Sequence, residues 1–407
     1  EITMKIVVLK FGGTSVGSIA KIKNVSKIVI SYLKKRYKVI VISSAMSGET
    51  NKLVKLTKKI SNNLKASEYD SIVSTGEQVA CSLIASDLIE KGYLSRSWLG
   101  WQIPIITQGK YSHSKIVSIN KQKIVKFLKQ GGVPIIAGFQ GINSDYRITT
   151  IGRGGSDASA IMVAKFFKAK KCIIYTDVDG VYTSDPNVVP RAKKIKKISY
   201  EEMLEMASLG AKVMQPHSIQ EARLNRIDIE VKSSFKNISG SLITKRKNVS
   251  SKNIIRGVSF TKNDAKISLI GVKDRPGVAA AIFEPLYKNS INVDMVVQNI
   301  SSNKKETDLT FTIKNEDLIK TKKLIIKNNK IKFKNIIIDE KVSKVSIVGV
   351  GMITTPGVTY RMFNALAKKK INIQVISTSE IKISVLVDRK NLKKAVDILH
   401  KEFKLEY

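Results

Sequence analysis

Through its first 245 residues the chain alternates short runs of β-branched residues with longer stretches whose apolar positions recur at helical spacing. The short runs predict buried strands, at Lys5–Lys10, Val39–Ser43, Val133–Ala137, Cys172–Thr176 and Ile227–Lys232. The longer stretches predict helices, at Ile19–Lys35, Leu53–Ala66, Gly76–Lys91, Lys121–Lys129, Asp157–Lys168, Tyr200–Leu209 and Pro216–Arg226. Because buried strands that alternate with amphipathic helices favour a parallel sheet covered on both faces, we expect an α/β domain with three αβα layers.

Beyond residue 253 the chain contains a weak internal repeat, which follows a polar and basic segment at 246–253 that predicts a linker. The strand and Pro-Gly turn of Ile267–Val278 correspond to Val345–Val358, and Ile291–Val296 corresponds to Ile371–Ile376. Each unit has the order strand, helix, strand, strand, helix, strand. This order predicts two ferredoxin-like βαββαβ domains.

The second repeat has little room for a complete final strand, since the chain ends at Lys401–Tyr407. Ile254–Phe260, directly after the linker, has a strand pattern but no obvious partner. We therefore expect this strand to complete the second repeat, so that the first repeat is an insertion within it. The predicted domains are residues 4–245, residues 265–340, and residues 254–264 together with 341–407, with 246–253 as the linker.

The chain is strongly basic, with 71 Lys and Arg against 33 Asp and Glu, a net charge of +38. A basic chain can bind nucleic acid. Such proteins concentrate their charge and use Arg and aromatic residues, whereas this chain has only 12 Arg and spreads its Lys over every segment. We therefore expect no nucleic-acid partner, and a field that helps to recruit anionic substrates over a short range.

The sequence predicts a cytoplasmic protein. No apolar run approaches the ~20 residues that span a bilayer, and the N-terminus has no signal-peptide pattern. The cysteines, Cys81 and Cys172, belong to no ligand-spaced cluster, which favours a reduced compartment. The histidines His113, His217 and His400 show neither metal spacing nor a triad partner, so we expect no metal site made of protein ligands alone.

The first motif with chemical meaning is Lys10–Ser15 (Lys-Phe-Gly-Gly-Thr-Ser), between a predicted strand and a predicted helix. Glycines let the backbone turn tightly and aim N–H groups at a phosphate, and Lys10 supplies a point charge for the β- and γ-phosphates. An ordinary strand-to-helix turn is the alternative. The Walker motif differs, because its Lys follows its glycines.

The second motif is Gly152–Asp157 (Gly-Arg-Gly-Gly-Ser-Asp), which leads into another predicted helix. Ser156 and Asp157 have the chemistry of helix caps, and capping alone would explain them. Arg153 favours a binding site, because a guanidinium between glycines is open to fork onto a carboxylate.

The third motif, Tyr175–Pro186, carries a strand into a turn rich in acids and glycine. An isolated Asp-Gly turn usually forms a hairpin. Here two further acids and Tyr182, whose ring can stack on a base, favour a nucleotide site. Two smaller motifs are Ser44–Asn51, after a strand, and Ser74–Glu77, which has the pattern of a helix N-terminus.

Together these motifs resemble those of the aspartokinases, amino-acid kinases that phosphorylate the side-chain carboxylate of L-aspartate. The resemblance covers essentially the whole chain and includes two regulatory ACT domains. Two positions depart from it, because Lys115 and His217 stand where the family commonly has Arg. Further matching segments are Glu201–Ala207, Gly210–Val213, Asp274–Gly277, Val293–Asn299 and Ile376–Ile381.

The resemblance implies transfer of the γ-phosphate of ATP to aspartate, which gives 4-phospho-L-aspartate and begins the synthesis of Lys, Thr and Met. An attacking carboxylate is already ionised at pH 7, so positioning and charge neutralisation should suffice without a general base. Mg²⁺ is expected to bind mainly through phosphate oxygens. Lys10 would stabilise the transferred charge, and Asp157 would orient Lys10 or the Mg²⁺ shell.

The resemblance also implies the remaining site residues. Those for aspartate are Thr50, Glu77, Arg153, Gly154 and Gly155. Those for ATP are Lys10, Phe11, Gly12, Gly13, Ser44, Ser156, Thr176, Asp177, Val181, Tyr182, Thr183, Ser184, Asp185, Pro186 and Lys194. Lysine or threonine effectors would bind at Asp274, Gly277, Val278, Ala279, Asn292 and Gln298 of one repeat and Val358, Asn372, Ile373 and Ser379 of the other.

Four alternatives remain open at this point. A kinase for glutamate, acetylglutamate or UMP would share the glycine loops but not the pair of ACT domains. A sensor could bind nucleotide and amino acid without turnover, and a basic nucleic-acid binder is the third alternative. The repeats could also serve only to dimerise the kinase, instead of binding effectors in a homo-oligomer.

Overall fold

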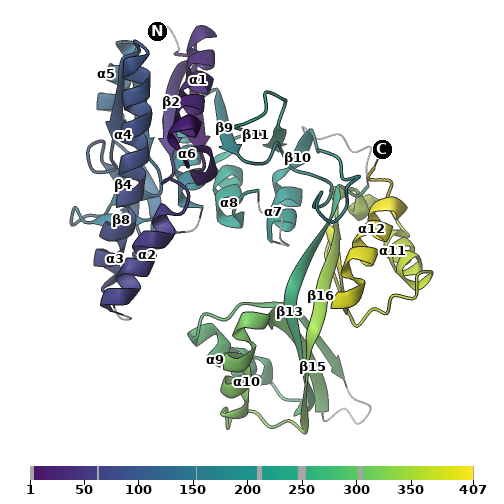
Figure 1. Cartoon of the computed structure of the whole chain (residues 1–407). Coiled ribbons are helices and arrows are strands. Elements are labelled where there is room, and N and C mark those ends of the chain that lie inside the picture. The colour runs from purple at the N-terminus through teal and green to yellow at the C-terminus, as the bar shows by residue number, and fades with distance from the viewer. Residues whose placement is uncertain are drawn as a thin grey trace. The chain divides into compact units, whose positions relative to one another are not determined.

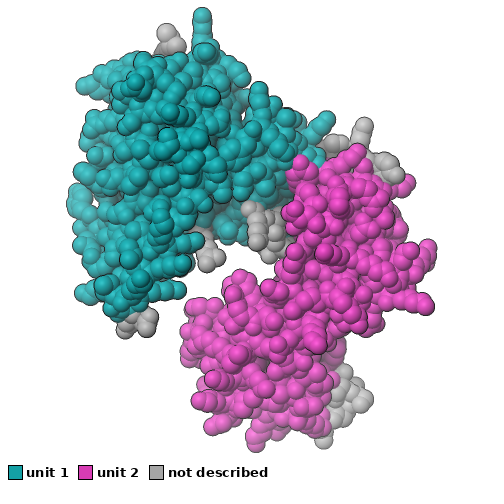
Figure 2. Space-filling view, viewed as in Figure 1, with its two compact units in different colours: residues 1–181, 194–208, 212–250 teal, residues 182–193, 209–211, 251–407 magenta. Residues whose placement is uncertain are grey.

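The computed structural model describes residues 4–61, 64–152, 154–208, 213–245, 254–300 and 306–406. The chain divides into two compact units, which Figure 2 colours separately. The first unit contains residues 1–181, 194–208 and 212–250, and the second contains residues 182–193, 209–211 and 251–407.

An eight-stranded sheet forms the centre of the first unit (Figure 1). Neighbouring strands are parallel except β11 and β12, which confirms the mostly parallel sheet predicted from the sequence. In spatial order the strands are β10 (Lys197–Ser199), β12 (Ser241–Thr244), β11 (Ile229–Ser233), β9 (Lys171–Thr176), β1 (Ile6–Phe11), β2 (Lys38–Ser43), β6 (Val133–Ala137) and β3 (Ser95–Trp98).

Helices cover both faces of this sheet because successive side chains of a strand point to opposite sides. Val7, Leu9 and Phe11 of β1 are buried under α1 (Ile19–Lys34) and α4 (Thr75–Glu90). Lys10, on the opposite side of the strand, meets α6 (Gly155–Phe166). The other helices of this unit are α2 (Glu49–Ile60), α3 (Ala66–Val73), α5 (Gln122–Lys129), α7 (Tyr200–Ser208) and α8 (Pro216–Asn225).

One expectation about local structure was wrong. The helix expected at Leu53–Ala66 instead runs from Glu49 to Ile60, because Gly48 adopts a left-handed conformation before it and Ser61 is extended after it. Ala66–Glu90, which contains α3 and α4, is long and apolar enough to cross a membrane by length and composition, and half of its most apolar window is buried inside the protein. A four-stranded sheet, unpredicted because its strands have only three to five residues, contains β5 (Lys115–Ile119), β4 (Ile105–Gln108), β7 (Gln140–Ile142) and β8 (Ile148–Thr150).

The second unit contains a six-stranded sheet shared by the two repeats. Its strands, in spatial order, are β14 (Val293–Ile300), β15 (Glu306–Lys314), β13 (Gly257–Lys273), β16 (Asn335–Val348), β18 (Lys382–Asp388) and β17 (Val375–Thr378). The helices are α9 (Val278–Lys288), α10 (Leu318–Ile326), α11 (Val358–Ala367) and α12 (Leu392–Glu402). This arrangement agrees with two α/β repeats of the ferredoxin-like type.

The long strand β13 belongs to both repeats. Its first part, Gly257–Thr261, pairs with Lys344–Val348, which also pairs with β18. Its second part, Asp264–Lys273, pairs with β15 of the first repeat. The strand that follows the linker therefore lies beside the second repeat, while the first repeat is built on its continuation.

Candidate active site

The parallel strands bring three loops to one edge of the first sheet, because their carboxyl ends point the same way. Backbone hydrogen bonds join these loops. The N–H of Gly12, after β1, donates to the carbonyl of Tyr175 in β9 (3.1 Å), and the N–H of Ser44, after β2, donates to that of Phe11 (3.0 Å). The glycine turn, the Ser44 loop and the end of β9 thus form one surface, where the first and third sequence motifs meet.

A buried ion pair lies at this surface. Lys10 Nζ is 2.7 Å from Asp157 Oδ1, and the two side chains are 10% and 9% exposed. Asp157 is in the first turn of α6, so the two residues, 147 positions apart in the sequence, are brought together by the packing of α6 on β1. A Cβ placed on Gly12 would lie 3.5 Å from Lys10 Nζ, which puts the ammonium directly beside the glycine turn.

Glycine is required at the start of α6. Gly154 is the N-cap residue with a φ of 74°, in the left-handed region. A Cβ at this position would lie 2.7 Å from the side chain of Gln215. Gly155 and Ser156 follow it and are buried, whereas Arg153 lies outside the described residues.

Glu77 is a buried carboxyl group, and only one of its two oxygens accepts a hydrogen bond within the described residues. It is 3% exposed on α4, and its Oε1 accepts a hydrogen bond from the N–H of Ala45 (3.2 Å). Its Oε2 has no hydrogen-bond partner within the described part of the chain. Burial raises the pKa of Glu77 to about 8. A cationic group bound beside Oε2 would favour the ionised form, so this position suits an ammonium group.

The residues predicted for the nucleotide occupy several environments. Thr176 Oγ1 donates to Asp177 Oδ1 (3.0 Å) just after β9. Lys194 Nζ donates to the carbonyl of Ser239 (2.6 Å). Val181 is fully buried, so its side chain packs inside the protein.

Tyr182, Thr183, Ser184, Asp185 and Pro186 belong to the second unit. Thr183 and Ser184 are buried there, and Thr183 Oγ1 is 2.8 Å from His400 Nε2. Contacts of these five residues with a nucleotide stay a prediction.

Thr50 lies half-buried in the first turn of α2, after the Ser44 loop. Lys115, which stands where the family commonly has Arg, is the first residue of β5 in the four-stranded sheet. His113 lies two residues before it. A Cβ on Gly152 would be 3.3 Å from His113 Nδ1, and one on Gly154 would be 3.1 Å from His217 Cε1. Two histidines therefore flank the second glycine motif, and burial lowers the pKa of His217.

The predicted effector residues lie in or next to the outermost strands β14 and β17, or in the turns that lead from the central strands β13 and β16 to α9 and α11. Gly277 and Gly357 each precede a helix in the left-handed conformation, with Val278 and Val358 buried at the helix starts. Exposed residues at the same repeat edges are Asp274, Asn292 and Gln298 in the first repeat and Asn372 and Ser379 in the second, whereas Ala279 and Ile373 are partly buried.

One residue that organises the site was missed from the sequence. Asp70 of α3 is fully buried and accepts four hydrogen bonds, from the backbone N–H and the hydroxyl of both Ser112 and Thr150, at 2.7–2.9 Å. Thr150 ends β8, two residues before Gly152, so Asp70 fixes the strand that carries the second glycine motif. A lone Asp on an amphipathic helix gives no signal that distinguishes it from a surface carboxylate.

Within the described ranges no group of three or more His, Cys, Asp or Glu residues is placed to hold a metal ion. A pocket of the first unit is lined by none of the predicted site residues and is considered separately below.

Comparison with known proteins gives one consistent result. The model of the amino acid kinase family matches residues 5–233, and an ACT domain model matches residues 267–328 and 345–403. An aspartate kinase from Pseudomonas putida is 46% identical, covering 99% of this chain and 98% of its own. An aspartokinase from Geobacillus stearothermophilus is 42% identical with the same coverage.

Solved structures agree with this result. The structure of E. coli aspartokinase III in complex with lysine and aspartate, in the T-state, has a TM-score of 0.81 and 25% identity. The match covers 98% of this chain and 99% of the E. coli chain.

The raised pKa of Glu77 predicts a pH-dependent stability. Because the folded pKa (about 8) exceeds the unfolded value (4.5), the folded state keeps a proton that the unfolded state loses between these two pH values. The stabilisation is complete below pH 4.5 and falls by about 1.4 kcal/mol per pH unit up to pH 8. Glu77→Gln should therefore gain stability relative to the wild type as the pH rises.

The difference in stability between wild type and Glu77→Gln is measured as the difference in their thermal unfolding midpoints from pH 5 to pH 9, a range of about four pH units that includes the folded pKa. Glu90→Gln, on the exposed end of the same helix, is the matched control. A difference between Glu77→Gln and wild type that stays constant with pH would show that Glu77 is ionised throughout.

Proposed function

The chain belongs to the aspartokinases, amino-acid kinases with ACT domains, and on that premise we propose that it transfers the γ-phosphate of ATP to the side-chain carboxylate of L-aspartate. The product is then 4-phospho-L-aspartate. The Lys10–Asp157 ion pair carries this proposal, since it places a buried cation beside the glycine turn at the carboxyl edge of a parallel sheet.

Catalysis rests on charge neutralisation and positioning. The attacking carboxylate is ionised at pH 7, so the enzyme needs no general base. Lys10 stabilises the negative charge that develops on the transferred phosphoryl group, with the backbone amides of Gly12 and Gly13 beside it. Asp157 holds the Lys10 ammonium in place at 2.7 Å. Ser44, at the end of the adjoining strand, faces the same phosphates.

Mg²⁺ fits the donor chemistry of this site. Asp157 supplies a carboxylate beside Lys10, and Mg²⁺ commonly combines one or two carboxylates with substrate phosphates and water. Bound there with ATP, the ion would supply charge neutralisation at the phosphates.

Aspartate is held by groups from three elements. Arg153 forks onto a carboxylate, with the backbone of Gly154 and Gly155 beside it. Glu77 binds the ammonium group. This assignment is supported by Glu77 Oε2, which has no hydrogen-bond partner among the described residues. Thr50 completes the subsite by hydrogen bonding. The adenosine and phosphates of ATP lie along Phe11, Ser156, Thr176, Asp177, the segment 181–186 and Lys194.

The second unit regulates this activity through two ACT domains, at residues 265–340 and at residues 254–264 together with 341–407. We place lysine, threonine or both at the edges of the two repeats, where the enzyme also forms at least a dimer. The structure of E. coli aspartokinase III in complex with lysine and aspartate supports lysine as an effector. The reaction begins the cytoplasmic synthesis of lysine, threonine and methionine, without a nucleic-acid or membrane partner.

Release of ADP from ATP and Mg²⁺, measured with aspartate, with glutamate and with no acceptor, tests the proposed reaction. ADP release that requires aspartate supports it, with hydroxamate trapping of the acyl phosphate identifying the product. Release with glutamate instead, or no turnover despite nucleotide binding, would favour another amino-acid kinase or a sensor.

Replacement of Lys10 tests the charge stabilisation. Lys10→Ala should lower kcat by at least about a hundredfold, equivalent to about 2.7 kcal/mol, because the transferred phosphoryl group loses its nearest cation. Lys5→Ala, which removes the same charge just before the same strand, should leave kcat unchanged. Near-normal turnover by folded Lys10→Ala enzyme would contradict the assignment.

Arg153→Lys tests the carboxylate subsite. The substitution keeps the charge but loses the planar two-pronged geometry, so the KM for aspartate should rise much more than the KM for ATP. Arg147→Lys, on the neighbouring turn, is the matched control. Equal increases in both constants would place Arg153 on the nucleotide instead.

Regulation is tested at Gln298, on the outermost strand β14. Lysine and threonine, singly and together, should inhibit the wild type, with a coupling of about 5- to 150-fold between effector and substrate binding. Gln298→Ala should relieve this inhibition without changing the uninhibited rate. Asn299→Ala, whose side chain points to the opposite side of the strand, is the control. If neither amino acid slows the wild type, the repeats serve only for association.

A further inference from the structure

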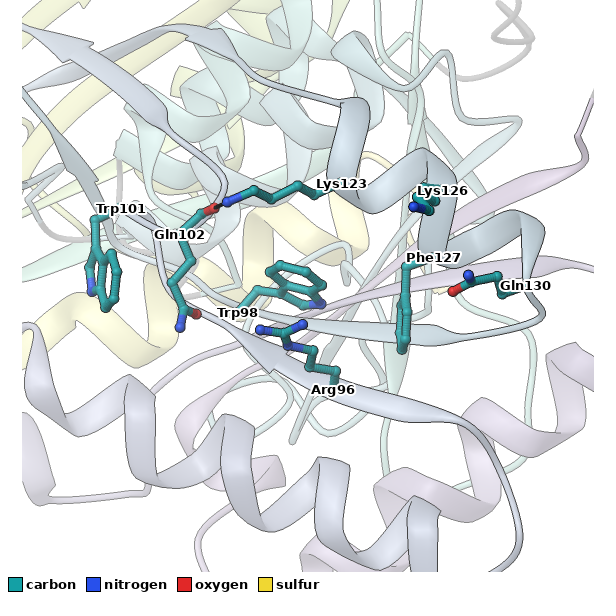
Figure 3. A pocket seen from close by; sticks show the side chains of 8 residues that line it. All are labelled: Arg96, Trp98, Trp101, Gln102, Lys123, Lys126, Phe127 and Gln130. Carbon is teal, nitrogen blue, oxygen red and sulfur yellow. Dashed lines mark hydrogen bonds between the residues drawn. The ribbon is translucent and has the colours of Figure 1, made fainter.

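The first unit contains a pocket that the aspartate kinase site does not use. It has a volume of about 540 Å³. β3 and the turn after it form one wall, and α5 forms the other (Figure 3). Its lining residues are Arg96, Trp98, Trp101, Gln102, Lys123, Lys126, Phe127 and Gln130.

The lining of the pocket is cationic. Arg96, Lys123 and Lys126 contribute three positive charges, and no carboxylate is among the lining residues. Within the described part of the chain no ion pair neutralises them, although Lys123 Nζ donates to the carbonyl of Gln102 (3.0 Å). Three cations around one cavity repel one another, and a bound anion would relieve this repulsion.

The pocket also contains both tryptophans of the chain. Trp101 is 52% exposed, which leaves a large aromatic surface available for stacking. Trp98 is 4% exposed, and the Arg96 guanidinium lies 4.2 Å from the centre of its ring. Phe127 packs edge-on against Trp98 at 6.0 Å between ring centres.

Trp98 carries a polar group without a partner. Its Nε1–H is buried and has no acceptor among the residues that the structure describes. Figure 3 shows this nitrogen turned towards the side of the pocket where Phe127 lies. A buried donor without an acceptor costs about 1–3 kcal/mol, and an oxygen atom of a ligand at the pocket floor would remove that cost.

From these features we propose that the pocket binds a planar anion, namely an aromatic ring that carries a phosphate or carboxylate group. The anionic group lies beside Arg96 with an oxygen accepting from Trp98, and the ring packs on the aromatic side chains that line the pocket. A volume of about 540 Å³ is within the range of small-molecule sites. A bare anion would leave the aromatic surface unused, and a neutral ring would leave the three positive charges without a counter-charge among the residues that the structure describes.

Tryptophan fluorescence gives a direct test, because both tryptophans line this pocket and no other tryptophan contributes a background. The full-length protein is titrated with phenyl phosphate, and in separate arms with inorganic phosphate and with phenol. We expect a saturable change with phenyl phosphate, at a Kd at least about tenfold lower than for either fragment. A linear, unsaturable response to phenyl phosphate would overturn the proposal.

Paired charge removals separate a defined site from general attraction by the basic protein. The double variant Arg96→Gln with Lys126→Gln should weaken phenyl phosphate binding at least about tenfold. Lys121→Gln with Lys129→Gln removes the same charge from the same helix region outside the lining, and should leave the Kd unchanged. Equal weakening in both double variants, or none in the first, would show that the pocket is not the binding site. Thermal unfolding midpoints and turnover of aspartate check that each variant is folded.

Discussion

The buried pair of Lys10 and Asp157 is the interaction on which the arrangement of the catalytic unit depends. An ammonium group removed from water costs several kcal/mol unless a negative charge and hydrogen-bond acceptors replace the solvent. Lys10 points to the face of the sheet opposite Val7 and Leu9, so its partner has to come from a helix on that face. Helix α6 meets this requirement, because its first turn, which carries Asp157, lies at the edge where β1 ends. The second glycine motif immediately precedes this turn and is thereby brought to the first.

Two buried carboxyl groups on consecutive helices show how the surroundings of an acid determine its use. Asp70 accepts four hydrogen bonds from Ser112 and Thr150, which occupy both of its oxygens and fix the strand before the second motif. Glu77, seven residues later, accepts one bond from Ala45, and burial raises its pKa. Both oxygens of the first acid accept hydrogen bonds, whereas one oxygen of the second has no hydrogen-bond partner among the described residues.

In the second unit, too, segments distant in sequence form one structure, because the two repeats share a single sheet. β13 and β16 each run through both repeats, so neither repeat has a sheet of its own. The segment 182–193 also belongs to this unit, since Val189 is fully buried in the core that α11 and α12 form on the sheet. Arg191 strengthens the connection through ion pairs with Asp397 (3.0 Å) and Glu406 (3.2 Å). Residues 187–193, which follow the third motif, are therefore part of the core of the second unit.

The sequence by itself determined the fold class, the repeat and the chemical motifs, because hydrophobic periodicity and glycine turns are local properties of the chain. The apolar run within Lys5–Lys10 and the helical spacing after Asp157 identified β1 and α6. Only the tertiary structure decided that Lys10 forms an ion pair with Asp157 and that Thr183 contacts His400. It also decided that both oxygens of Asp70 accept hydrogen bonds, whereas Glu77 Oε2 accepts none within the described residues. Each of these depends on which face of an element packs against which neighbour. The energy of a charged or polar group is set by the partners and the burial that this packing supplies, and residues distant in sequence provide both.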